Sequence, residues 1–232
     1  QIKKYNIDTV YIFDDNLRPI LFSYFSNVNK IYSFGFGLQN KFLTNTNILP
    51  KKLIKENKYL ILHSFFKLLK IPVVEKKISL PSLSLQKKYL KIFINLDSSI
   101  KQKNWGDENF FKLIKKINVF CFPIFVINCL NYKSEIFKLL EQEKINYEDV
   151  SKLNIPDLFI KINECDISIS NDTGPAHMSI ALEIKTFMIF LEKNKFSYKY
   201  SKFMFPLILD KSKDGGNYIL NEIDLNTNIL NK

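Results

Sequence analysis

The chain has 232 residues, of which 46% are hydrophobic and 25% are charged, a balance typical of a soluble globular protein. Its formal net charge is +11 at pH 7, but the excess comes from lysines scattered through every segment, and Arg18 is the only arginine. This distribution does not indicate a nucleic-acid-binding face, and the absence of any apolar run of about 20 residues argues against a membrane span.

The first part of the chain contains the patterns of a small α/β domain. Residues 9–13 are expected to form a strand and residues 30–36 are a second apolar segment, while residues 17–25 and 58–69 are expected to form helices. Prolines and serines are then frequent between residues 72 and 84, as is typical of a linker. We therefore expect a domain boundary after residue 84, with domains at 1–84 and 85–232.

After this boundary, strand and helix patterns alternate. Strands are expected at 91–96, 120–128, 146–150, 166–170 and 186–191, with helices at 107–118, 133–142, 156–163 and 175–182, and a weak helical face from 217 onward. Because the strands are apolar on both faces, the pattern predicts a parallel sheet covered by helices on both sides. Ligands of such sheets bind beyond the carboxyl ends of the strands.

One loop between a strand and a helix, Ser170 to His177, has the composition of an anion site. Asp172 or Thr173 can cap the helix. Gly174 lets the backbone approach a ligand, while the helix dipole and the first-turn amides favour a diphosphate. His177 lies one turn into the helix, where it can donate to a phosphate oxygen. An ordinary capped helix with a buried histidine is the simpler interpretation of these residues alone.

A second loop follows the predicted strand at 91–96. Its small hydroxyl residues Ser98 and Ser99, with Lys103 shortly beyond, suit a phosphate or a carboxylated acceptor. The alternative for Lys103 is a solvated lysine in a lysine-rich loop. The three cysteines, Cys121, Cys129 and Cys165, fit no zinc-binding spacing and are expected to be reduced, in a cytoplasmic protein.

The run from Asp166 to Leu182 resembles the signature of glycosyltransferase family 9, the lipopolysaccharide heptosyltransferases: an apolar strand, then D-T-G-P-x-H, then a small-residue helix ending in A-L. The second loop also resembles this family, whose members carry two small residues and a lysine two positions before a tryptophan. The resemblance implies a GT-B fold of two Rossmann-like domains, the first incomplete here. It gives Trp105 a structural role and implies that substrate is bound by Ser98, Ser99, Lys103, Asp172, Thr173, Gly174 and His177.

The resemblance also implies an activity. A heptose would pass from a nucleotide sugar, with ADP-heptose as the expected donor, to a lipopolysaccharide core acceptor, with inversion and without a metal or other cofactor. Because the acceptor is lipid-linked, peripheral contact with the inner membrane is expected.

Two family features are missing from the sequence. The first is the glycine-aspartate loop that supplies the expected general base, which nothing before Asp8 provides, so no catalytic residue is assigned. The second is a glycine-rich turn with a glutamate after the strand at 120–128. A non-catalytic nucleotide-sugar-binding remnant is therefore the alternative.

Overall fold

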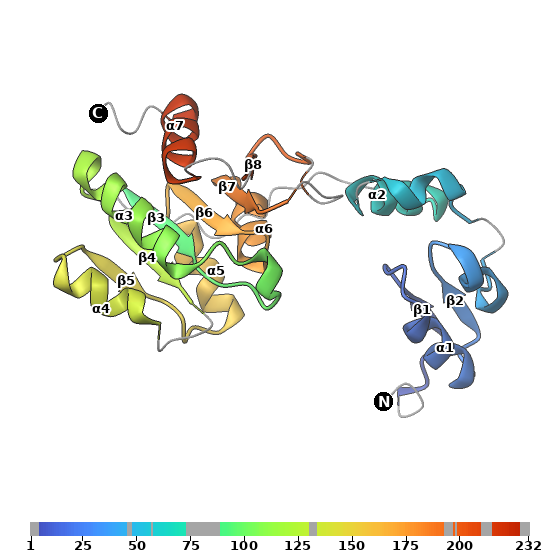
Figure 1. Cartoon of the computed structure of the whole chain (residues 1–232). Coiled ribbons are helices and arrows are strands. Elements are labelled where there is room, and N and C mark those ends of the chain that lie inside the picture. The colour runs from blue at the N-terminus through green and yellow to red at the C-terminus, as the bar shows by residue number, and fades with distance from the viewer. Residues whose placement is uncertain are drawn as a thin grey trace. The chain divides into compact units, whose positions relative to one another are not determined.

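The computed structural model describes residues 5–45, 48–56, 58–72, 89–129, 134–192, 197, 199–209 and 215–227 (Figure 1). The chain divides into two compact units, residues 1–75 and 76–232, each with its own parallel sheet. The domain boundary that we expect after residue 84 falls in the segment 73–88, which lies outside the described residues. The expected fold class, α/β with parallel sheets covered by helices, is confirmed.

The first unit pairs two parallel strands, β1 (Thr9–Tyr11) and β2 (Lys30–Tyr32). They are connected through α1 (Leu17–Phe25) and followed by two 3-10 helices, η2 (Gly37–Phe42) and η3 (Lys51–Lys55), and by α2 (Lys58–Leu68). β1 is shorter than the strand predicted at residues 9–13, and β2 takes up only the first part of the apolar segment at residues 30–36. Beyond Tyr32 the chain leaves the sheet, and Phe34 and Phe36 instead pack into a buried cluster with Phe65 of α2.

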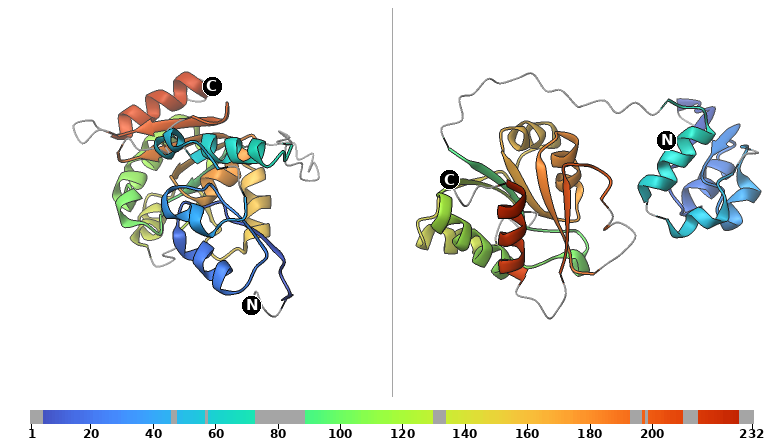
Figure 2. Two further views of the ribbon diagram at one scale, coloured as in Figure 1. Left: turned by 90° about the vertical axis from the view of Figure 1, so that its right-hand side faces the viewer. Right: turned by 90° about the horizontal axis from the view of Figure 1, so that it is seen from above.

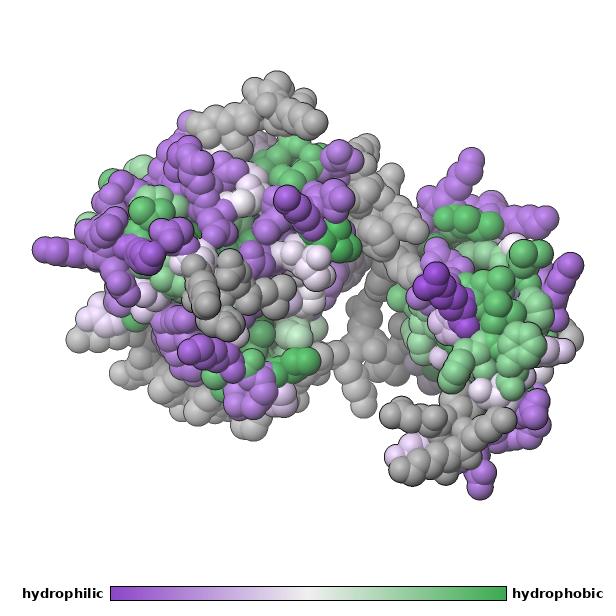
Figure 3. Space-filling model, turned by 60° about the horizontal axis from the view of Figure 1, so that its bottom comes forward, coloured by the Kyte–Doolittle hydropathy of each residue, from purple (hydrophilic) through white to green (hydrophobic). Residues whose placement is uncertain are grey.

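Large apolar side chains are exposed on this first unit. The exposed fraction reaches 73% at Phe25, 67% at Tyr5 and 62% at Phe22. Figure 3 shows apolar surface on this unit, in green. The other described residues of the unit leave these side chains exposed.

The described residues of the second unit form six parallel strands: β3 (Lys91–Asn95), β4 (Ile124–Asn128), β5 (Tyr147–Asp149), β6 (Ile167–Asn171), β7 (Lys185–Phe190) and β8 (Met204–Ile208). Their spatial order is β5-β4-β3-β6-β7-β8. Counted within the unit this is the order 3-2-1-4-5-6 of a doubly wound sheet. The order reverses between β3 and β6, and ligands of such sheets bind at that point, beyond the carboxyl ends of the strands.

Helices cover both faces of the sheet (Figure 2). One face packs against α3 (Asp107–Cys121), α4 (Glu135–Gln142) and α7 (Gly215–Thr227), and the other against α5 (Ile155–Asn163) and α6 (Gly174–Ala181). Successive side chains of a strand point to opposite faces. Ile92 and Ile94 of β3 accordingly join the cluster under α3, while Phe93 joins the cluster with α5.

Two elements of this unit differ from the prediction. The strand predicted from residue 120 begins only at Ile124, because α3 continues to Cys121 and ends where Phe122 adopts a left-handed conformation (φ 42°). Helices commonly end on a left-handed residue. The last strand, β8, was not predicted. It carries Pro206 and pairs only with β7 at the edge of the sheet, where a missing amide is tolerated.

Candidate functional site

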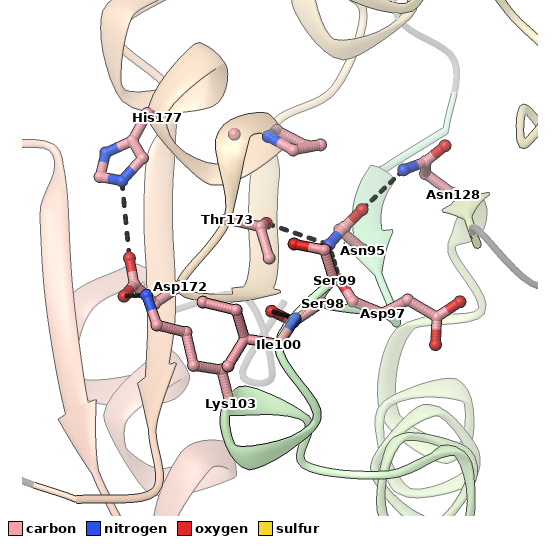
Figure 4. A pocket seen from close by; sticks show the side chains of 12 residues that line it. Asn95, Asp97, Ser98, Ser99, Ile100, Lys103, Asn128, Asp172, Thr173 and His177 are labelled. Atoms are coloured by element: carbon pink, nitrogen blue, oxygen red, sulfur yellow. Dashed lines mark hydrogen bonds and ion pairs between the residues drawn. The ribbon is translucent and has the colours of Figure 1, made fainter. Parts of the chain in front are cut away.

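A cavity of about 550 Å³ lies at the carboxyl ends of β3 and β6, where the strand order reverses. Its volume falls within the roughly 300–1,000 Å³ of small-molecule sites. All seven residues expected to bind a ligand contribute to its wall, from both predicted loops. The complete lining is Asn95, Asp97, Ser98, Ser99, Ile100, Lys103, Asn128, Asp172, Thr173, Gly174, Pro175 and His177 (Figure 4).

An asparagine ends each of three neighbouring strands: Asn95 in β3, Asn128 in β4 and Asn171 in β6. The Asn95 amide accepts a hydrogen bond from Asn128 (2.6 Å) and donates to Oγ1 of Thr173 (3.1 Å) and to the backbone oxygen of Asp97 (2.8 Å). The end of β3 is thereby tied to the loop after β6. Sequence analysis missed Asn95 and Asn128, although one polar residue closing each apolar strand was a visible signal.

Asn171 is fully buried and fixes the position of the loop that carries Lys103. Its Nδ2 donates to the backbone oxygen of Leu96 (2.7 Å) and to Oδ1 of Asn104 (3.1 Å), and its Oδ1 accepts from the backbone amide of Trp105 (3.1 Å). The Trp105 ring packs edge-on against Phe110 with 5.0 Å between centroids, beside the core cluster. This packing agrees with the structural role expected for Trp105.

Asp172 joins the two loops electrostatically. It is 8% exposed, and its Oδ2 lies 2.5 Å from Nζ of Lys103, while its Oδ1 lies 3.5 Å from Nε2 of His177 (Figure 4). Burial by itself raises the pKa of Asp172, but hydrogen bonds and positive charge from His177 and Lys103 outweigh that effect and lower the pKa overall. Lys103 is thus ion-paired rather than simply solvated.

His177 is held from its other side by Tyr200. The Tyr200 hydroxyl is hydrogen-bonded to Nδ1 of His177, and the two rings are stacked with 5.7 Å between centroids. The His177 side chain is 48% exposed, so the buried histidine of the simpler interpretation is not what the structure contains. No local pattern marked Tyr200, which comes from the segment before β8.

The start of α6 differs in one respect from the prediction. Thr173 occupies the N-cap position, but it makes no side-chain capping hydrogen bond. Its hydroxyl instead donates to the backbone oxygen of Asn171 (3.2 Å) and accepts from Asn95. A Cβ built on Gly174 would meet no protein atom within 4 Å, so the space beside this residue is open. The first turn of α6 therefore borders the cavity without a capping side chain in between.

The arrangement suits a ligand in which a small anionic group is attached to a polar group. Lys103 and His177 supply hydrogen-bond donors, and the positive end of the α6 dipole adds to them. In the part of the chain that the structure describes, no three His, Cys, Asp or Glu side chains are placed to hold a metal ion, and no helix is long and apolar enough to cross a membrane. The segment after β4, where the sequence lacks the glycine-rich turn and glutamate of the family, includes residues 130–133, which lie outside the described residues.

The sequence model of glycosyltransferase family 9 (heptosyltransferase) matches residues 52–199. A lipooligosaccharide heptosyltransferase 2 from Campylobacter jejuni is 38% identical over 58 residues, which is 25% of this chain and 18% of the relative. This aligned segment thus spans less than a fifth of the relative's length.

Two solved structures from E. coli resemble the whole chain. ADP-heptose LPS heptosyltransferase II has a TM-score of 0.71 at 13% identity, covering 99% of this chain and 78% of that one. A heptosyltransferase with bound ADP-2-deoxy-2-fluoro heptose has a TM-score of 0.68 at 13% identity, covering 95% and 72%. At this level of identity the similarity shows the fold alone, and it agrees with the expected GT-B type.

Proposed function

The chain belongs to glycosyltransferase family 9, and on that premise we propose that the cavity between β3 and β6 holds the nucleoside diphosphate of a sugar donor. One observation carries the proposal. The two segments that resemble the family, Ser98 to Lys103 and Asp172 to His177, line a single cavity although Lys103 and Asp172 are 69 residues apart in sequence. That cavity also lies where doubly wound sheets bind their ligands.

In the proposed reaction an acceptor hydroxyl attacks the anomeric carbon of ADP-heptose and inverts it. The bond from that carbon to the diphosphate oxygen breaks, and ADP leaves. Negative charge grows on the diphosphate as this bond breaks, so fixed donors around it lower the barrier. Lys103, His177 and the first turn of α6 are placed to do this. We propose that they take the place of a metal ion, and we assign no residue of this chain to proton removal.

The proposed identities of the donor and the acceptor are taken from similar proteins. A structure with the same fold has ADP-2-deoxy-2-fluoro heptose bound, and the sequence relative is a lipooligosaccharide heptosyltransferase. We propose ADP-heptose as the donor and a lipopolysaccharide core saccharide as the acceptor. The lipid-linked acceptor would bring the protein to the inner membrane surface as a peripheral protein.

Calorimetric titration with ADP tests the binding claim. Wild-type protein should bind ADP, and Lys103→Ala should weaken binding roughly ten- to a hundred-fold, as expected for loss of a charged hydrogen bond. Lys101→Ala is the matched control, since Lys101 is exposed in the same loop and does not line the cavity. Absence of ADP binding by the wild type, or equal losses in the two variants, would overturn the proposal.

A further inference from the structure

We propose that the protonated form of His177 supplies the net positive charge that holds the diphosphate, so that ligand binding is accompanied by the uptake of a proton. This inference rests on the proposed function, because it concerns the charge of the same site. It follows from how the charged side chains are distributed along the cavity wall. Lys103 and His177 both belong to this wall, but only His177 is able to add net charge to it.

Lys103 brings no net charge to the diphosphate end of the cavity. Its Nζ lies 2.5 Å from Oδ2 of Asp172, a nearly buried carboxylate that also lines the cavity. This carboxylate is ionised at neutral pH, because the pKa of Asp172 lies below the ordinary value of 3.8. Asp97 adds a second carboxylate to the wall. Among the described residues that line the cavity, the formal charges therefore total −1 as long as His177 is neutral.

A diphosphate is itself an anion with more than one negative charge, so a wall of this charge repels it. The positive end of the α6 dipole is equivalent to only about half an elementary charge. Protonation of His177 adds a full charge in the first half of the same helix and brings the formal charge of the wall to zero. The negative charge of the ligand in turn favours the protonated imidazole, and the binding of ligand and proton is therefore coupled.

The surroundings of His177 are able to accommodate the protonated ring. Its titratable neighbours in the part of the chain that the structure describes come from three segments. Nε2 lies 3.5 Å from Oδ1 of Asp172, Nδ1 is hydrogen-bonded to the hydroxyl of Tyr200, and Lys103 lies on the other side of Asp172 (Figure 4). The Tyr200 phenol is uncharged at neutral pH, and its oxygen accepts as well as donates hydrogen bonds. Both N–H groups of the imidazolium therefore face an acceptor.

The same neighbours explain why the proton arrives with the ligand. Above about pH 7 an ordinary histidine is mostly neutral, and the positive charge of Lys103 opposes protonation of His177 in the empty site. An added diphosphate outweighs this repulsion, because it brings more than one negative charge to the same region. The His177 side chain is 48% exposed, so it exchanges protons with solvent directly.

Calorimetric titration of the full chain with ADP-ribose tests the inference. The diphosphate of this compound is esterified at both ends and stays fully ionised across the neutral range, so any proton taken up goes to the protein. At about pH 7.5 the measured heat should depend on the ionisation enthalpy of the buffer, with a slope that corresponds to the uptake of up to about one proton. Affinity should fall as the pH rises from about 6.5 to about 8.5, by up to about tenfold per pH unit, because the protonated protein binds more tightly. Adenosine, which has no phosphate, should give no proton uptake.

Three variants assign the proton. His177→Gln keeps a hydrogen-bond donor but does not titrate, so it should bind ADP-ribose more weakly, without proton uptake and with little dependence on pH. Tyr200→Phe removes the acceptor for Nδ1–H of the imidazolium, so its proton uptake should move to lower pH. His63→Gln is the matched control, because it makes the same substitution at the other histidine of the chain, in α2 of the first unit. It should behave as the wild type does.

Three results would overturn the inference and leave the proposed function standing: binding of ADP-ribose by the wild type without proton uptake, an uptake that persists in His177→Gln, or an equal uptake when adenosine binds. Failure of the wild type to bind either ADP-ribose or ADP would instead overturn the proposed function, and this inference with it.

Discussion

Tyr200 is hydrogen-bonded through its hydroxyl to Nδ1 of His177 and stacks on the same imidazole. Burial, together with the negative charge of Asp172, raises the pKa of Tyr200 to about 12, so the phenol keeps its proton at neutral pH. A phenol that donates to Nδ1 leaves the proton of a neutral imidazole on Nε2, the nitrogen that lies 3.5 Å from Asp172. Tyr200 is therefore positioned to select the tautomer of His177.

Nitrogen-15 NMR of histidine-labelled protein tests this relationship. In the wild type we expect the neutral form of the His177 ring to carry its proton on Nε2, and in Tyr200→Phe we expect a mixture of the two tautomers because the donor to Nδ1 is lost. The chain has only two histidines, so His63→Gln assigns the signals. An unchanged His177 spectrum in Tyr200→Phe would contradict the role given to Tyr200.

Gly174 provides a sharper test of close backbone approach. Its Cβ would meet no protein atom within 4 Å, so Gly174→Val should fold normally while its side chain fills space beside the first turn of α6. We expect ADP binding to be abolished and the melting temperature without ligand to be nearly unchanged. His177→Ala should lose less affinity, about 1.5–3 kcal/mol. Thermal melts with and without ADP measure both effects, and retention of wild-type affinity by Gly174→Val would refute the diphosphate site.

Asp172 should make stability depend on pH in the acid range. Its pKa is lower in the folded protein than the ordinary value of 3.8. Such a carboxyl stabilises the fold above its unfolded pKa, and this contribution is lost as the pH falls through the lower folded pKa. We expect Asp172→Asn to be less stable than wild type by about 1–3 kcal/mol at pH 6–7.

Urea unfolding across the range from about pH 7 to about pH 2 measures the effect, because the difference in stability between the two proteins should narrow only as the pH falls below the ordinary value of 3.8. Glu108→Gln is a useful comparison. The Glu108 carboxylate is exposed and paired only with Lys112 among the contacts described, so its removal should change stability little. A gap for Asp172→Asn that stays constant with pH would show that its ionisation does not stabilise the fold.

ADP affinity should not depend on magnesium. The donors and positive charge at the proposed diphosphate end come from Lys103, His177 and the α6 dipole. We expect titrations with EDTA and with added magnesium to give dissociation constants within about twofold of each other. A large loss of affinity on chelation would show that a metal ion is part of the site.

Local pattern was sufficient to predict much of the second unit. Strand and helix periods, together with glycine, proline and acidic residues at helix starts, predicted most of its elements, because these signals depend on neighbouring residues. The two loops that carry the candidate ligand-binding residues were predicted for the same reason. The predicted start of β4 was wrong, because Phe120 and Cys121 suit either a strand or the end of α3. β8 was not predicted because it contains Pro206. A proline is tolerated in this strand only because the strand lies at the edge of the sheet.

Only the tertiary structure decided that the two loops line one cavity. Their meeting depends on β3 and β6 being neighbours, which is a consequence of strand order rather than of any local pattern. The hydrogen bonds that hold them together join residues far apart in the chain, such as Asn95 with Thr173 and Asn171 with Trp105. The contacts of Asp97 and Tyr200 also depend on the tertiary structure. Each is an unremarkable residue in its own segment, and only the packing of the sheet brings Asp97 to the end of β4 and Tyr200 to His177.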